Sequence, residues 1–233
     1  MSRRGGTRVK ATRKPIVVLA GEDRNDRRSM RVLLEQWCPD MRGRIVEIND
    51  KPTLHAASSG TLAARAETLA SKIRARAVLE EAEVACVFVH EDLDGVDSDR
   101  HPVIQERVEK ALAAAMRTGT AHYVLAVAEI EAWLLLFPEA LSAFAASWSV
   151  PAKFRGKDTG RVVDPKKVLK TEVSAGRYRE SDAPLILEKA ADLGLVVRPV
   201  GHNRSYALFR SGAVECCANH LAGGAAKARR RPS

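Results

Sequence analysis

Two short apolar runs constrain the fold of this chain more than any other feature. Residues 15–21 (PIVVLAG) and 84–90 (VACVFVH) are rich in β-branched side chains and do not alternate with polar positions. Continuous runs of this length are typical of strands that are buried on both faces of a parallel sheet. The first run ends in glycine and the second opens into an acidic segment, so each predicts a buried strand that leads into a loop.

Helical patterns separate these runs from two further candidate strands. The predicted helices are 25–37, 61–82 and 102–117, and the further strands are 44–49 and 122–127. The resulting order, β-α-β-α-β-α-β, predicts an α/β fold with a mostly parallel sheet, right-handed crossovers and flanking helices. Ligands of such sheets bind at the carboxyl ends of the strands.

The rest of the chain is predicted to be helical, and its two ends are strongly basic. We divide the sequence into a basic tail (1–14), an α/β domain (15–147), a helical C-terminal portion packed on that domain (148–222) and a second basic tail (223–233). The two tails carry ten Lys and Arg and no acidic residue, whereas the whole chain has a net charge of +9, so the body is close to neutral. We expect such tails to be disordered and to attract polyanions without reading a sequence.

The sequence has no feature of a membrane-spanning or secreted protein. No run of about 18 apolar residues without charges occurs, and no apolar segment follows the basic N-terminus. We therefore expect a cytoplasmic protein with no membrane contact. Its four cysteines, Cys38, Cys86, Cys216 and Cys217, form no CxxC pair, so we expect reduced, buried thiols.

The most acidic segment of the chain, 91–99 (EDLDGVDSD), directly follows the second apolar run. Asp92 and Asp94 stand two residues apart after a buried strand, and Gly95 lets the loop turn, so both carboxylates can face one cation. Glu22 follows the first strand, whose carboxyl end can face the same crevice. Carboxylate oxygens are the ligands that Mg²⁺ prefers. We therefore predict a Mg²⁺ or Mn²⁺ site formed by Glu22, Asp92 and Asp94, with Glu22 as a ligand or a general base.

Two other interpretations of the acidic segment have different consequences. A calcium loop of the EF-hand type is excluded, because Gly95 falls at position 4 of the loop where that motif needs glycine at position 6. Residues 92–96 (DLDGV) also resemble the nucleophile motif of haloacid-dehalogenase-type phosphatases. In that family the motif usually follows the first strand and a later acidic pair completes the metal site, and no such pair stands out here. A small-molecule phosphatase with Asp92 as nucleophile therefore stays an alternative.

The glutamate and the acidic pair together carry a more specific resemblance. Residues 21–26 (GEDRND), which end the first strand and open a helix, resemble the glutamate motif of Toprim domains, and 92–94 (DLD) resembles their DxD motif. Toprim domains serve topoisomerases, primases and OLD-type nucleases, in which the acids bind Mg²⁺ for phosphoryl transfer. The resemblance implies a Toprim-like sheet and the same metal chemistry. Asp26 stands where the nuclease-like members carry a second acid.

A third motif, 129–135 (EIEAWLL), looks like a signature of small stand-alone bacterial Toprim-like proteins, which are often found near mobile-element or phage-defence genes. This resemblance implies that Glu131 is a further metal-site acid; a helix N-terminal acid stabilised by the macrodipole is the alternative. It also implies nucleic acid (DNA or RNA) as the partner and, by analogy alone, an ATPase partner protein and a homodimer. Toprim proteins commonly have glycine directly after the motif glutamate, where this chain has Asp23, so the geometry of that loop is open.

Basic side chains complete the predicted site. The predicted phosphate contacts are Lys166, Lys167, Arg229, Arg230 and Arg231. A lone histidine such as His90 or His202 is expected to be structural more often than catalytic. We expect a divalent-metal-dependent nuclease or a related phosphoryl-transfer enzyme. The alternative is a non-catalytic Toprim-like module that binds nucleic acid or has a regulatory role. The presence of Asp23 where Toprim proteins commonly have glycine favours this alternative.

Overall fold

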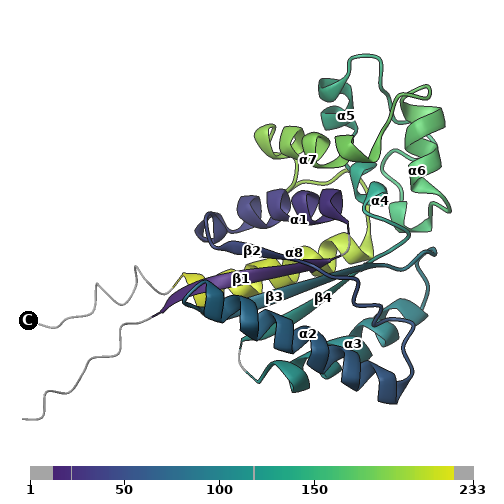
Figure 1. The fold of residues 1–233 in the computed structure, drawn as a ribbon. Coiled ribbons are helices and arrows are strands. Elements are labelled where there is room, and N and C mark those ends of the chain that lie inside the picture. Colours follow the sequence, from purple (N-terminus) through teal and green to yellow (C-terminus); the bar gives the residue numbers. More distant parts are fainter. Residues whose placement is uncertain (1–12, 22, 118, 223–233) are drawn as a thin grey trace, which may run out of the picture.

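A four-stranded sheet forms the centre of the protein (Figure 1). The computed structural model describes residues 13–21, 23–117 and 119–222. The strands are β1 (Lys14–Gly21), β2 (Ile45–Asn49), β3 (Ala82–Asp92) and β4 (Thr120–Ala126). They lie in the order β2-β1-β3-β4, and every neighbouring pair is parallel. The α/β fold predicted from the apolar runs is therefore confirmed.

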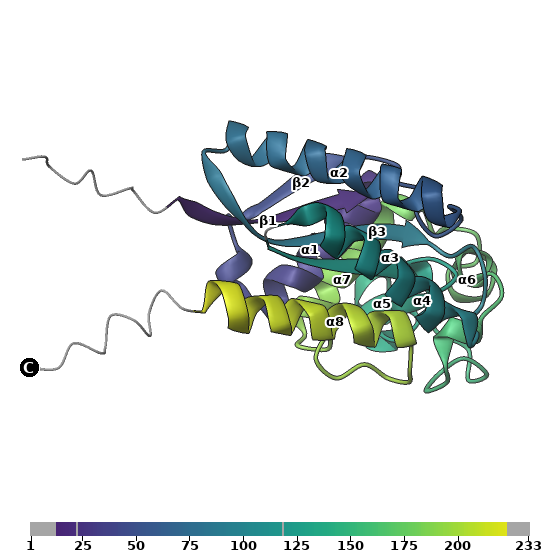
Figure 2. The ribbon, with the colours of Figure 1, turned by 90° about the horizontal axis from the view of Figure 1, so that it is seen from below.

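Helices cover both faces of the sheet, as Figures 1 and 2 show. The helices between the strands are α1 (Arg24–Trp37), the short η1 (Pro39–Met41), α2 (Ser59–Leu79) and α3 (Arg100–Met116). One face is covered by α2 and α3, and the other by α1 together with α8 (Arg204–Cys216) from the far end of the chain. Because both faces are buried, the central strands need apolar side chains at successive positions, as the two runs provide.

The segment after β4 is helical, as the sequence predicts. Its further elements are α4 (Glu131–Leu134), α5 (Pro138–Phe144), η2 (Thr159–Arg161), α6 (Pro165–Val168), η3 (Leu169–Val173), η4 (Glu180–Asp182), α7 (Ala183–Asp192) and η5 (Cys217–Leu221). Helix α7 packs against α1 and α5, and α8 packs on β4, so this portion shares a hydrophobic core with the sheet. No helix in the described part of the chain is long and apolar enough to cross a membrane.

Successive residues of each central strand face opposite sides of the sheet. Val17, Leu19 and Phe88 belong to the apolar cluster that includes α1 and α8. Val18 and Val87 belong to the cluster that includes α2 and α3. All five side chains are fully buried, and burying such a side chain contributes about 1.5–3 kcal/mol. The same alternation decides which face each polar residue at the end of β3 joins.

Two disulfides tie the C-terminal helices to the rest of the fold, so the prediction of reduced thiols is wrong. Cys217 pairs with Cys38 after α1, and Cys216 pairs with Cys86 in β3. The Cα–Cα distances, 5.8 and 6.2 Å, are normal for disulfides. Successive residues of a helix point about 100° apart. Adjacent cysteines therefore reach two different elements, and their adjacency in sequence does not prevent two separate bridges.

The two edges of the sheet have different surroundings. At the carboxyl edge, where β1 and β3 end, lie α4 and α6 (Figure 1). At the amino edge β1 begins and α8 ends, so the described chain starts and finishes on the same side (Figure 2). Thr120, the first residue of β4, has its Oγ1 only 2.8 Å from Nε2 of His220 in η5. The two ends of the described chain are thus far from whatever binds at the carboxyl edge.

Candidate functional site

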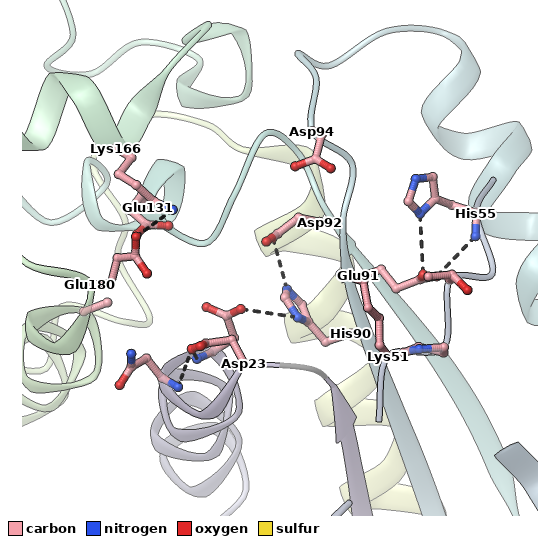
Figure 3. Close-up of a pocket in the computed structure, with 15 residues that line it drawn as sticks. Asp23, Lys51, His55, His90, Glu91, Asp92, Asp94, Glu131, Lys166 and Glu180 are labelled. Carbon is pink, nitrogen blue, oxygen red and sulfur yellow. Dashed lines mark hydrogen bonds and ion pairs between the residues drawn. The ribbon is translucent and has the colours of Figure 1, made fainter. Parts of the chain in front are cut away.

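A pocket of about 430 Å³ opens at the carboxyl edge of the sheet, where ligands of parallel sheets bind (Figure 3). Its walls come from the start of α1, the loop after β2, the end of β3, and the segments around α4, α6 and η4. Its acidic side chains are Asp23, Asp26, Glu91, Asp92, Asp94, Glu131 and Glu180, and its lysines and histidines are Lys51, His55, His90 and Lys166. The acids outnumber the lysines, so the pocket favours a cation.

On the floor of the pocket a buried histidine lies between two carboxylates. His90 and Asp92 point to the α1 side of β3, and Asp26 comes from the first turn of α1. The Nδ1 atom of His90 is 3.9 Å from Asp26 Oδ2, and its Nε2 atom is 3.5 Å from Asp92 Oδ1. The His90 side chain is 3% exposed, yet its Nε2 and the Oδ1 of Asp92 have no hydrogen-bond partner among the described residues. Buried polar atoms without a hydrogen bond are rare, and here the two atoms face each other as an ion pair on the pocket floor.

Burial and the neighbouring charges set the ionisation of the side chains on the pocket floor. Burial raises the pKa of Asp26 to about 6, although the charge of His90 acts to lower it. Burial alone would lower the pKa of His90, but the carboxylates of Asp92 and Asp26 outweigh it, so that pKa lies above its ordinary value. The imidazolium form of His90 is therefore favoured as the counter-charge of the two aspartates.

A second acidic group surrounds a lysine on the opposite wall. Glu131, the first residue of α4, is 6% exposed and accepts a hydrogen bond from the Tyr178 hydroxyl at 3.1 Å. The Nζ of Lys166 lies 3.1 Å from Glu180 Oε1 and 3.5 Å from Glu129 Oε2. Burial raises the pKa of Glu131 to about 8, against the opposing charge of Lys166. Burial acts to lower the pKa of Lys166, but the neighbouring carboxylates, Glu131 above all, raise it, so this side chain stays cationic.

Glu91, between His90 and Asp92, faces the other side of the sheet and has a structural role. Its carboxylate accepts hydrogen bonds from the backbone N–H of Leu54 at 2.8 and 2.9 Å and of His55 at 3.2 Å. The hydroxyl of Tyr123 donates to it at 2.5 Å. These bonds fix the loop after β2 as one wall of the pocket.

The predicted metal-site acids fit a hard divalent cation. Asp26, Asp92 and Asp94 offer only carboxylate oxygens, and Asp94 is exposed at the mouth of the pocket above Asp92 (Figure 3). Among the described residues no three His, Cys, Asp or Glu side chains converge closely enough to hold an ion by themselves, and Glu22 lies outside those residues. Mg²⁺ commonly uses one or two carboxylates together with water and substrate phosphate. Asp92 Oδ1, which accepts no hydrogen bond from the described residues, is a carboxylate oxygen of this kind.

Asp23 stands at the position where Toprim proteins commonly have glycine. Its backbone is extended (φ −81°, ψ 141°), a conformation open to any residue. Its side chain caps α1 by accepting hydrogen bonds from the N–H groups of Asn25 (2.6 Å) and Asp26 (3.2 Å). Such a cap contributes about 1 kcal/mol. The aspartate therefore helps to fix the turn that carries Asp26, and this position does not require glycine.

The structure brings together five of the residues predicted from the sequence. The five that line the pocket are Asp26, Asp92, Asp94, Glu131 and Lys166. Lys167 is exposed and is not part of the lining. The predicted residues that lie outside the described part of the chain are Glu22, Arg229, Arg230 and Arg231.

The sequence alone does not identify three residues of the site. It favours a structural role for His90, which the structure places between two acids. The signal for it is the spacing His90-x-Asp92, because alternate residues at a strand end share one face. Glu180 and Tyr178 enter from the chain around η4, and no local pattern in the sequence predicts where that segment packs.

Comparison of the chain with protein-family models, with curated proteins and with solved structures finds no match.

Proposed function

We propose that the protein is a divalent-metal-dependent nuclease, or a related phosphoryl-transfer enzyme, that acts on nucleic acid at the Asp92 pocket. The observation that carries the proposal is the buried Oδ1 of Asp92 on the floor of an acidic pocket, which accepts no hydrogen bond from the described residues and has only His90 Nε2, at 3.5 Å, facing it. Burying a polar atom without a partner costs free energy, and a divalent cation would satisfy it. The Toprim-like motifs of the sequence are a second, independent support.

Each wall of the pocket has a distinct task in this proposal. Asp92, with Asp26 or Asp94, would hold Mg²⁺ or Mn²⁺, which when bound activates water and neutralises phosphate charge. His90 positions Asp92 and Asp26 through its two ring nitrogens. Lys166 extends from the opposite wall, where its ammonium group can donate to a phosphate oxygen.

The negative charge of the pocket explains why binding of a nucleic-acid substrate would require a bound cation. A phosphodiester carries a negative charge, and the acids of the pocket repel it in the absence of a cation. The volume of about 430 Å³ is within the usual range for small-molecule sites, so the pocket can admit the phosphate and part of a nucleotide.

The test is cleavage of supercoiled plasmid, single-stranded DNA and RNA in Mg²⁺, Mn²⁺ or EDTA. Wild-type protein is compared with the Asp92→Ala/Asp94→Ala double variant. A matched control, Asp40→Ala/Asp192→Ala, removes two exposed aspartates that do not line the pocket. We expect metal-dependent cleavage by the wild type and the control and none by the pocket variant.

Cleavage that persists in the pocket variant would contradict the proposal. Metal-dependent release of phosphate from a phenyl phosphate, without cleavage of any nucleic acid, would favour the small-molecule phosphatase. Binding of nucleic acid with no turnover of either substrate would favour the non-catalytic module.

A further inference from the structure

Positive charge within the body of the protein is concentrated in one segment. Residues 151–180, which we name the cap, contain nine Lys and Arg but four Asp and Glu. Outside the cap and the two basic tails, the chain contains nineteen Lys and Arg and twenty-five Asp and Glu. The cap is therefore a basic segment on an otherwise acidic body, and its charge is independent of the tails.

Most of the cap's cations have no counter-ion in the part of the chain that the structure describes. Within the described residues, six exposed side chains of the cap form no ion pair: Arg155, Lys157, Lys167, Lys170, Arg177 and Arg179. The other three are paired, namely Lys153 with Glu172, Arg161 with Asp158, and Lys166 with acids of the pocket. Unpaired cations of one segment repel each other, and an external polyanion would relieve that repulsion.

Helix α6 of the cap lies at the carboxyl edge of the sheet (Figure 1), which is the edge where the pocket opens. Lys166 lines the pocket from α6. The carbonyl of Gly160 accepts a hydrogen bond from the N–H of Asp97 at 2.8 Å, which joins the cap to the loop that follows Asp94. The cations of the cap thus belong to the segment that forms one wall of the catalytic pocket.

The cap is also held firmly in place. Leu169, Val173 and Tyr178 are buried in the hydrophobic core that the cap shares with the sheet. Thr159 accepts a hydrogen bond from the Nδ2 of buried Asn203 at 3.1 Å. The backbone that carries the cations of the cap is therefore held in place. This reduces the conformational entropy that is lost when those side chains bind a ligand.

The described residues nearest to the two basic tails lie at the edge of the sheet opposite the pocket. The described chain begins and ends at the amino edge (Figures 1 and 2). A strand of the length of β1 spans about 25 Å at 3.3 Å per residue. The cap, and not the point where either tail begins, is next to the pocket.

We propose that the cap is a nucleic-acid-binding surface that holds the phosphodiester backbone and directs a strand into the Asp92 pocket. The inference rests on the proposed function and extends it. An acidic pocket does not by itself attract a polyanion, and the cap is a basic surface beside it. Lys and Arg that neutralise phosphates release counter-ions, which makes such binding strong at low salt and independent of sequence.

The experiment measures binding apart from cleavage. Fluorescence anisotropy follows the full-length protein, with both tails, on labelled single-stranded DNA, duplex DNA and RNA in EDTA. The cap variant is Arg155→Glu/Lys157→Glu/Lys167→Glu. The control variant, Arg42→Glu/Arg76→Glu/Arg117→Glu, makes the same change of charge at exposed positions at the ends of η1, α2 and α3 near the amino edge. Thermal melting establishes that both variants fold.

We expect the cap variant to bind at least one of the three probes roughly ten-fold more weakly or worse at 0.1 M salt, with a salt slope smaller by about 2–3 for three lost contacts. The affinity of the control variant should be within roughly three-fold of that of the wild type, because the control changes only the net charge of the protein. Equal weakening by both variants would overturn the inference, and so would no binding of any probe by the wild type at low salt.

The outcomes separate this inference from the proposed function. If the cap variant alone loses binding and the wild type cleaves nothing with Mg²⁺ or Mn²⁺, the binding surface stands and the nuclease proposal fails. If the cap variant still binds and cleaves like the wild type while Asp92→Ala/Asp94→Ala is inactive, the nuclease proposal stands and the cap is not its binding surface.

Discussion

Glu91 and Asp92 are adjacent on β3, and their carboxylates lie on opposite faces of the sheet. Glu91 accepts hydrogen bonds from two backbone N–H groups and from the Tyr123 hydroxyl. Asp92, whose side chain is 33% exposed to the pocket, has a buried oxygen that accepts none from the described residues. Charge and position in the sequence do not distinguish a structural from a functional carboxylate here. The hydrogen-bond donors that surround each carboxylate do distinguish the two roles.

The largest effect is expected where the unsatisfied carboxylate is removed. Asp92→Asn should reduce metal-dependent cleavage by roughly 10²–10³-fold or more, as when a group that stabilises the transition state is lost. The free energy of unfolding should fall by no more than about 1 kcal/mol, because the substitution weakens the 3.5 Å ion pair of the partly exposed Asp92 with His90 but breaks no hydrogen bond to Asp92 Oδ1. Cleavage rates and urea unfolding measure the two effects. A clear loss of stability would place Asp92 in the same class as Glu91.

The opposite result is expected at the satisfied carboxylate. Glu91→Ala should lower the free energy of unfolding by about 3 kcal/mol, because it leaves two backbone N–H groups and a tyrosine hydroxyl without their acceptor. Tyr123→Phe removes one of these bonds and should cost about 1 kcal/mol. Urea unfolding provides both values. A Glu91→Ala variant as stable as the wild type would remove the contrast between the two residues.

A stability change far from both carboxylates should leave the pocket unaffected. Replacing Cys86 and Cys216 together by serine should lower the free energy of unfolding by about 2–4 kcal/mol. Cleavage at a temperature well below the unfolding midpoint should be unchanged, since this disulfide joins the interior of β3 to α8. Melting and cleavage at 25 °C test the two statements. Lost cleavage in a folded variant would show that the pocket depends on the bridge.

The smallest effect concerns Glu131 in metal-free protein. Its pKa is raised by burial from 4.5 to about 8, so the folded state keeps a proton that the unfolded state loses. The stability from this proton is complete below pH 4.5 and is lost as the pH rises through 8. The slope is at most about 1.4 kcal/mol per pH unit. Glu131→Gln should therefore flatten the fall in stability between pH 6 and pH 7 in EDTA, measured by urea unfolding. Parallel pH profiles for variant and wild type would contradict the raised pKa.

The sheet and much of the site could be predicted from the sequence because both depend on local patterns. Strands buried on both faces give continuous apolar runs, and consecutive parallel strands end at one edge of the sheet. Asp92 and Asp94 could therefore be placed at the carboxyl edge of the sheet without coordinates, whereas Asp26 came from a family resemblance. Glu131 came from a family resemblance alone, and the structure places it in the same pocket.

The rest depends on contacts between distant segments. Whether Glu91 is satisfied depends on the loop that carries Leu54 and His55, and no residue near Glu91 in sequence indicates that partner. The pairing of Cys216 and Cys217 depends on where α8 packs. The basic character of 151–180 is visible in the sequence, but its place beside the pocket is not.

The most direct test is anomalous diffraction from crystals soaked in Mn²⁺. We expect one strong peak in the pocket, about 2.0–2.2 Å from a carboxylate oxygen of Asp92, a distance typical of small divalent cations on oxygen ligands. The peak should be absent from Asp92→Asn crystals and present in Tyr123→Phe crystals. Wild-type crystals with no Mn²⁺ at Asp92, at a concentration that supports cleavage, would contradict the metal site and the function proposed for it.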